Sequence, residues 1–266
     1  MHYACEHDLW HFFQSTKQVN HSKGSTTQWW AELQAGKLWR KLTTPQIFAL
    51  VHFSSSVASL LDCNDHFGVQ AIMLDFSKAF DKMRPDLAVK TLLELKIDGS
   101  LVAIVQDFLS NREQCVKFRN TKSIFSSINI GVPQGTVLGP LLWNAFIDDL
   151  SPPTPHLKYA DDTTLYHSLS KPNCVLTNSI AHRASVSIND NHLQRALDYT
   201  SQYCTDNCLL LNVNKTLSIN FTLQKTLTID TYNINHSEIL YATNVRLLGV
   251  IHTEKSYRSN HSSLLS

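Results

Sequence analysis

Three aspartates have the side chains and the spacing for metal-dependent chemistry on phosphates. Asp75 lies near the end of a short apolar run, 70–76 (QAIMLDF), of the kind that forms a buried strand, and Asp161 and Asp162 are adjacent. Mg²⁺ prefers oxygen ligands and binds through one or two carboxylates together with substrate phosphates. Two such ions, about 3.5–4 Å apart, can hold the attacking and leaving oxygens of an in-line phosphoryl transfer. The aspartates are therefore a candidate two-metal site.

The site depends on whether the fold brings these aspartates together. Residues 157–160 and 163–167 are predicted strands on either side of the Asp pair, which makes the pair the tip of a tight hairpin. If this hairpin and the strand at 70–76 are neighbours in one sheet, the carboxylates meet at its edge. Clustered like charges repel and raise each other's pKa unless cations neutralise them. The competing interpretation of the pair is a solvated turn, because Asp favours turns.

The remaining elements indicate an α+β fold. Apolar spacing predicts helices at 85–95, 101–109, 137–150 and 186–207. Strand-like stretches occur at 114–118, 123–130, 209–212, 217–223, 227–234 and 245–251. Helices gathered between strand pairs predict an antiparallel sheet with helices packed on one face.

The same patterns divide the chain into three parts. Residues 1–65 form a divergent N-terminal segment of poor periodicity, in which 50–61 could be a helix. The main domain spans 66–254, and the polar stretch 255–266 is expected to be a frayed tail.

Composition narrows the classes of protein. The chain has 266 residues, of which 43% are hydrophobic and 17% charged, and this is typical of a globular domain. Its net charge of +1 argues mildly against a strong grip on a nucleic-acid backbone by itself, although not against a site that neutralises phosphates with metal ions. The six cysteines form no CxxC pair, and neither a secretory signal nor a membrane-length apolar run is evident. A protein of the nucleus or cytoplasm, without a membrane partner, is expected.

Five ordered segments resemble the motifs of reverse transcriptases from non-LTR, LINE-type retrotransposons. Residues 71–83 (AIMLDFSKAFDKM) resemble motif A, and residues 131–150 (GVPQGTVLGPLLWNAFIDDL) resemble motif B. Residues 158–166 (KYADDTTLY) resemble motif C, the YADD box. Motif D is similar to 208–216 (CLLLNVNKT), and the motif E region to 245–254 (VRLLGVIHTE). The resemblance covers roughly residues 55 to 254.

The resemblance implies a polymerase palm and an RNA-directed DNA polymerase. Its partners would be an RNA template, a DNA primer and a dNTP. Asp75, Asp161 and Asp162 would hold two Mg²⁺ ions, for which Mn²⁺ is a possible substitute.

Further roles follow from the same resemblance. The backbone carbonyl of Phe76 would face a metal, and Phe80 matches the steric gate that crowds a ribose 2′-hydroxyl, with plain core packing as the other interpretation. Gln134 and Gly135 match the loop beside the incoming nucleotide and template.

Motifs C, D and E supply the last candidates. Tyr159 would help to place the hairpin against the primer end. Lys215 matches a lysine that can donate a proton to pyrophosphate, or is an exposed lysine at a strand start. Leu248 and Gly249 lie either in a primer-grip turn or in an ordinary strand.

The chain also departs from the family pattern. A fingers region is not recognisable in residues 1–65, which are expected to be either partly disordered or a fingers remnant. Little sequence follows motif E for a thumb, and an endonuclease is missing. The chain is therefore expected to be truncated, and a catalytically inactive remnant that at most binds nucleic acid or a partner is the alternative. An intron-maturase-type reverse transcriptase would share the YADD hairpin, but the amino-acid sequence of the motif B segment favours the LINE group.

Overall fold

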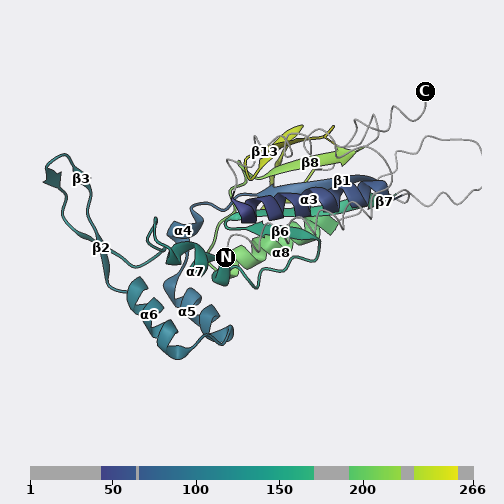
Figure 1. The fold of residues 1–266 in the computed structure, drawn as a ribbon. Coiled ribbons are helices and arrows are strands. Elements are labelled where there is room, and N and C mark those ends of the chain that lie inside the picture. The colour runs from purple at the N-terminus through teal and green to yellow at the C-terminus, as the bar shows by residue number, and fades with distance from the viewer. Residues whose placement is uncertain (1–42, 64–65, 171–191, 223–230, 257–266) are drawn as a thin grey trace, which may run out of the picture.

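The computed structural model describes residues 43–63, 66–170, 192–222 and 231–256, and in these ranges the chain forms a five-stranded sheet (Figure 1). In sheet order the strands are β11 (Leu240–Tyr241), β8 (Leu217–Thr222), β1 (His66–Leu74), β7 (Asp162–Ser170) and β6 (His156–Tyr159). β11 runs parallel to β8, while the other neighbours are antiparallel. The predicted α+β fold with an antiparallel sheet is confirmed.

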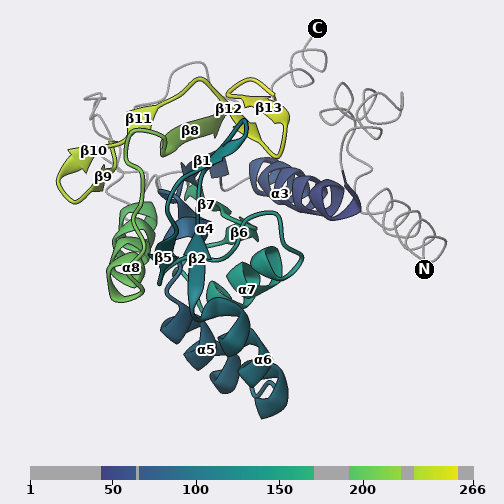
Figure 2. The same ribbon diagram turned by 90° about the vertical axis from the view of Figure 1, so that its left-hand side faces the viewer.

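Helices cover both faces of this sheet, not one face as the sequence predicted. Because side chains alternate along a strand, Val69 and Ala71 of β1 face α3 (Thr44–Asp62), whereas Ile72 and Leu74 face α8 (His192–Asp206). Figure 2 shows these two helices on opposite sides of β1 and β7. The reason is that both faces of β1 are apolar, so each needs a hydrophobic cover.

Helix α3 packs on the sheet through a continuous apolar stripe. Its start is fixed by a hydrogen bond from the Thr43 backbone N–H to Oε1 of Gln46, at 2.8 Å. The ring of Phe53, which is fully buried, meets Tyr166 edge-on at 5.5 Å. The sequence assigned this helix to the N-terminal segment 1–65, but its packing joins it to the main domain. Residues 1–42 and 257–266 lie outside the described residues.

A helical insertion lies between β1 and β6. It contains α4 (Ala79–Lys82), α5 (Pro85–Glu94), α6 (Gly99–Leu109) and α7 (Leu138–Phe146). The helices predicted at 85–95 and 101–109 are confirmed. The helix predicted at 137–150 ends at Phe146, because Nζ of Lys158 donates to the carbonyls of the following turn at 2.8–3.0 Å.

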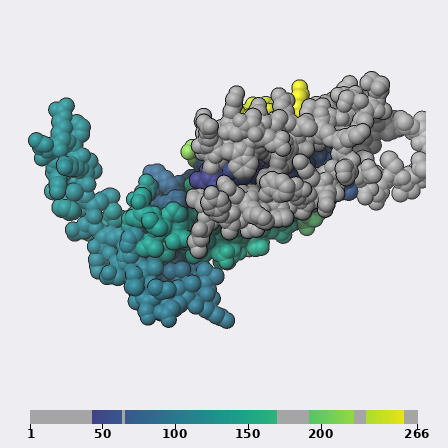
Figure 3. Space-filling model, in the orientation of Figure 1, coloured from purple at the N-terminus to yellow at the C-terminus, as the bar shows by residue number. Residues whose placement is uncertain are grey.

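A narrow arm projects from this insertion. In the described structure it consists of β2 (Arg112–Gln114), β3 (Lys117–Phe118), β4 (Thr121–Lys122) and β5 (Ser126–Ile128), where the sequence predicted two longer strands. Figures 1 and 3 show it standing away from the body. Its apolar side chains are exposed, with 72% for Val116, 70% for Phe118 and 89% for Ile124. The strands of the arm therefore gain no support from packing against the described part of the chain, and they are shorter than predicted.

Two further predictions needed correction near the C-terminus. The single strand predicted at 245–251 is a hairpin of β12 (Asn244–Leu247) and β13 (Val250–Thr253), whose turn residues Leu248 and Gly249 have φ of 48° and 89°. Residues 209–212 form no strand beyond a single bridge between Phe76 and Leu211. A second small hairpin pairs β9 (Asn233–Ile234) with β10 (Ser237–Glu238). Parts of the stretches predicted at 186–207 and 227–234 lie outside the described residues.

The loop before α7 is docked on the segment after β1. The backbone N–H of Gly131 donates to the carbonyl of Met83 at 2.8 Å, and that of Val132 donates to the carbonyl of Phe80 at 2.9 Å. Gly131 has a φ of 76°, and a Cβ there would lie 2.7 Å from the carbonyl oxygen of Asp81. Only glycine permits this close approach, so Gly131 fixes where the loop sits.

We expect Gly131→Ala to lower the free energy of unfolding by about 2 kcal/mol or more, because it adds a left-handed backbone penalty to a clash with backbone atoms. Gly99→Ala is the matched control, since a Cβ at Gly99 meets nothing within 4 Å. Urea denaturation of both variants checks this. Equal midpoints for the two would contradict the docking role of Gly131.

We also expect the chain to lose stability in mild acid through His252. This side chain is 6% exposed, its ring meets that of Phe53 edge-on at 5.7 Å, and its Nε2 has no hydrogen-bond partner among the described residues. Burial lowers the pKa of His252 from 6.5 to about 4. The unfolded chain therefore binds the proton first as the pH falls, and stability drops between pH 6.5 and pH 4.

The contribution of His252 between pH 7.5 and pH 5 amounts to about 2 kcal/mol. His252→Phe keeps the ring contacts and should flatten this pH dependence, whereas His52→Asn, at an exposed position of α3, should not. Urea titrations at the two pH values make the comparison. The same pH slope in wild type and His252→Phe would show that another group is responsible.

Candidate functional site

The register of the sheet brings the three aspartates to one end of its central strands. Leu74 of β1 pairs with Thr163 of β7, so continuing the register by one residue sets Asp75 opposite Asp162. Asp161 lies in the two-residue turn that joins β6 to β7. The predicted meeting of one strand end with one hairpin tip is therefore present.

The proximity of the three carboxylates has an electrostatic consequence at Asp162. The pKa of Asp162 is raised by partial burial first, and then by the charges of Asp161 and Asp75. Asp162 still reaches solvent at the surface of the domain. These groups thus interact at a position that solvent can reach.

The carboxylates are near one another but not gathered into a finished metal cage. Within the described ranges, no three His, Cys, Asp or Glu side chains are grouped tightly enough to hold a metal ion as they stand. Like charges without a cation repel, so separated side chains are the expected arrangement. The chemistry of the donors, oxygen atoms with a raised pKa at Asp162, fits a hard divalent cation.

The backbone around Asp75 is pinned by the segment that contains Lys215. The N–H of Asn212 donates to the carbonyl of Asp75 at 2.7 Å, and the N–H of Ser77 donates to the carbonyl of Leu210 at 2.7 Å. The N–H of Asp75 also donates to Oγ1 of Thr216 at 3.4 Å. Lys215 is exposed beside these contacts. Motif D therefore holds motif A in place through its backbone.

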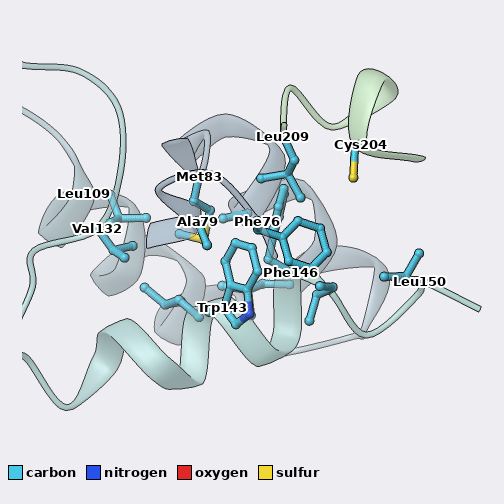
Figure 4. Close-up of a cluster of buried hydrophobic side chains, with 14 of the residues drawn as sticks. Phe76, Ala79, Met83, Leu109, Val132, Trp143, Phe146, Leu150, Cys204 and Leu209 are labelled. Carbon is cyan, nitrogen blue, oxygen red and sulfur yellow. The ribbon is translucent and has the colours of Figure 1, made fainter. Parts of the chain in front are cut away.

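The turn that carries Asp161 is held by a residue that the sequence analysis did not single out. Ala160 has a φ of 50°, and its carbonyl accepts a hydrogen bond of 2.7 Å from the indole N–H of Trp143. Trp143 is fully buried on α7, and its ring meets that of Phe76 at 5.8 Å (Figure 4). The available signal was a tryptophan inside an apolar helix, whose N–H needs a partner when buried. The identity of that partner depends on the tertiary fold.

The remaining predicted residues surround this centre. Phe80 is half-buried, with its ring 5.4 Å from that of Trp143, so it does pack in the core. Gln134 is exposed, and its amide donates to the carboxylate of Asp81 at 2.7 Å. Gly135 has a φ of 77°, with open space where a Cβ would be. Tyr159, on β6, lies with its hydroxyl 3.5 Å from that of Thr43.

The acidic pair Asp148–Asp149, in contrast, belongs to a separate network. The carboxylate of Asp149 accepts a hydrogen bond from the hydroxyl of Tyr203, and the carbonyl of Asp148 accepts one from Lys158. Burial lowers the pKa of Lys158, while the charges of the two aspartates raise it. This pair therefore compensates a half-buried lysine.

Comparisons with known proteins show which family the chain resembles. The family model for reverse transcriptase (RNA-dependent DNA polymerase) matches residues 41–252. A probable RNA-directed DNA polymerase from transposon BS of Drosophila melanogaster is 32% identical over 58% of this chain and 16% of its own length. The RNA-directed DNA polymerase from mobile element jockey of the same organism is 29% identical over 67% of this chain and 18% of its own length.

A solved structure supports the fold. Apo telomerase from Candida tropicalis, truncated from its C-terminal domain, superposes with a TM-score of 0.50 at 13% identity, over 88% of this chain and 46% of that one. In the described part of the chain, no helix is both long and apolar enough to cross a membrane.

The matches cover most of this chain, although the chain spans less than a fifth of the length of the curated relatives named above. The family model extends over the sheet, the Asp75 strand and the Asp161–Asp162 hairpin alike. The chain belongs to the reverse transcriptase (RNA-dependent DNA polymerase) family.

Proposed function

We propose that this chain is the palm of an RNA-directed DNA polymerase, with residues 66–254 as its catalytic domain and α3 packed against them. In the proposed reaction, the 3′-hydroxyl of a DNA primer attacks the α-phosphate of a dNTP opposite an RNA template. A new phosphodiester bond forms as the bond to the β-phosphate breaks, and pyrophosphate leaves. The observation that carries the proposal is the meeting of Asp75 and Asp162 across the sheet, with Asp161 in the adjoining turn.

Asp75, Asp161 and Asp162 would hold the divalent ions that membership of the family implies, namely two Mg²⁺, or Mn²⁺ as a substitute. Such ions supply a lowered pKa for the primer hydroxyl and stabilisation of charge on the leaving oxygen. The protein contributes a set of oxygen donors that repel one another in the absence of a cation. Binding of cations would relieve this repulsion, so the arrangement favours the cation-bound state.

The surrounding residues have proposed positioning roles. Gly135 lies in open space with a left-handed backbone, which lets a nucleotide or template strand approach the loop closely, and Gln134 is exposed next to it. The exposed Lys215 belongs to the segment that pins Asp75, so a proton donor for pyrophosphate would lie on the same side of the site. Tyr159, next to the Asp161 turn, would contact the primer end.

Phe80 would act as the steric gate. Phe80 follows Asp75 by five residues, and its ring packs on that of Trp143. One side of the ring is buried, and part of its surface is open. A rigid ring in this position would exclude the 2′-hydroxyl of a ribonucleotide by contact. Packing in the core and gating are compatible, because packing makes the ring rigid.

The second candidate function is a non-catalytic remnant that binds nucleic acid or a partner chain. The observation that favours it is that no three His, Cys, Asp or Glu side chains among the described residues are grouped tightly enough to hold a metal ion as they stand. Accurate placement of the reacting groups is a large part of catalysis, so a domain that binds its ligands without this placement would not turn over.

Primer extension separates the two candidates. On poly(rA)/oligo(dT) with dTTP and Mg²⁺, we expect the chain to extend the primer and Asp161→Asn with Asp162→Asn to reduce the rate at least about 100-fold, because the metal contributes several kcal/mol to the transition state. Asp107→Asn, at an exposed position of α6, is the control and should keep the wild-type rate. A folded wild-type chain without extension would identify the remnant.

Nucleotide selection tests Phe80 separately. We expect Phe80→Val to raise incorporation of rTTP relative to dTTP at least about tenfold, because the contact that excludes the 2′-hydroxyl is removed. Phe108→Val is the matched control, since Phe108 is also a partly buried phenylalanine packed against the same core. Ratios of kcat/KM for the two nucleotides give the answer. If both variants change the ratio equally, loosened packing is the cause and Phe80 is not the gate.

A further inference from the structure

We infer that Trp143 is the positioning residue of this site, and that its indole N–H sets the place of the turn carrying Asp161. The inference rests on the proposed function, since the turn is taken to carry a metal-binding carboxylate. It assigns to a helix residue, outside the YADD segment 159–162, the task of fixing the hairpin relative to Asp75.

The first argument is that Trp143 contacts both carboxylate-bearing segments, in each case at the residue next to an aspartate. Its ring meets that of Phe76, which directly follows Asp75, and its N–H donates to the carbonyl of Ala160, which directly precedes Asp161. A single rigid side chain thus spans the two segments whose separation determines whether the carboxylates can share a ligand. Figure 4 shows the Trp143 ring beside Phe76 within the buried cluster.

The second argument comes from the backbone of the turn. Ala160 has a φ of 50°, a conformation that costs an alanine free energy, and such conformations persist where the surroundings enforce them. The N–H of Trp143 at 2.7 Å supplies that enforcement at the carbonyl of the strained residue itself. The bond is needed on both sides, because a fully buried indole N–H without an acceptor is costly as well.

The third argument is that the hairpin is tied to α7 a second time. Two residues before Ala160, Lys158 donates to the carbonyls of Ile147, Asp148 and Leu150, just beyond the end of the helix. With β6 anchored there, the hairpin cannot slide along α7. The bond from Trp143 then determines the angle at which the tip is presented.

The test compares Trp143→Phe with Tyr203→Phe. The hydroxyl of Tyr203 donates to the carbonyl of Phe146 at 3.0 Å and to the carboxylate of Asp149, so its loss also removes buried hydrogen bonds at the end of α7. These bonds lie one helical turn beyond Trp143 and do not involve Ala160. Both variants are first compared by urea denaturation, which measures the general loss of stability. If Trp143 only fills the core, the two variants should differ from wild type in global stability alone and not in the local order of the turn.

The first readout is hydrogen–deuterium exchange of the amides in 157–165, which needs neither metal nor activity. We expect exchange in this stretch to become about fivefold faster in Trp143→Phe after correction for global stability, and to stay within about twofold of wild type in Tyr203→Phe. Equal exchange in the two variants overturns the inference, whatever the chain does catalytically.

The second readout is the affinity for Mn²⁺ alone, followed by electron paramagnetic resonance. We expect Trp143→Phe to weaken binding about fivefold, Tyr203→Phe to leave it unchanged, and Asp161→Asn with Asp162→Asn to abolish it. If wild type binds no more Mn²⁺ than the double aspartate variant, the proposed function fails, and the exchange measurement still decides whether Trp143 holds the turn.

A second variant covers the case in which Trp143→Phe does not fold. Replacing Trp143 with benzothienylalanine, in which sulfur takes the place of the indole N–H, keeps the shape of the ring and removes the donor. The same fivefold increase in exchange of 157–165 is expected. Wild-type exchange with this analogue would show that the shape of the ring, and not its hydrogen bond, places the turn.

Discussion

Mutual repulsion among Asp75, Asp161 and Asp162 is the constraint around which the rest of the domain is arranged. Charges that raise the pKa of Asp162 would move apart if their backbones were free to do so. Asp75 is held by the ladder of β1, by the bond from the N–H of Asn212 to its carbonyl, and by the nearby bond from the N–H of Ser77 to Leu210. Because α3 and α8 bury both faces of the sheet, the strands have little freedom to relax.

The helix α7 connects this centre to the rest of the insertion. It presents Trp143 to the turn on one side. Its last residue, Phe146, accepts a hydrogen bond from Tyr203, and the carbonyls just beyond its end accept hydrogen bonds from Lys158. A half-buried lysine that donates to three carbonyls acts as a helix cap supplied by a distant strand, with Asp148 and Asp149 compensating its charge. Motifs B and C, which are separate in sequence, are therefore held together by these hydrogen bonds.

Local patterns were sufficient to predict the strand ending near Asp75, the hairpin around Asp161 and Asp162, and the two helices that follow motif A. Each of these depends on apolar periodicity or turn chemistry within about ten residues, which the chain displays directly. The sequence also indicated that the aspartates meet, through the ordered motifs.

Features that depend on distant partners were not predictable in this way. The end of α7 at Phe146 is set by Lys158, the covering of a second sheet face is set by α3, and the acceptor for Trp143 lies in another motif. The hairpin at 244–253 was predicted as one strand over 245–251, with a turn at Leu248 and Gly249 as the alternative. Periodicity alone did not decide between them, because leucine is an unusual residue for a left-handed turn.

The position of β1 in the sheet also determines how the chain must fold. Its partners are β7, where Leu74 pairs with Thr163, and β8, where Val69 pairs with Phe221, so the central strand waits for contacts about 90 and 150 residues further along. On a ribosome, β1 leaves the exit tunnel with neither neighbour yet synthesised. The neighbouring helices α5 and α6 can pack at once, because their contacts are local. We therefore expect the insertion to be ordered early and the carboxylates to be brought together last, since non-local strand pairing is slow.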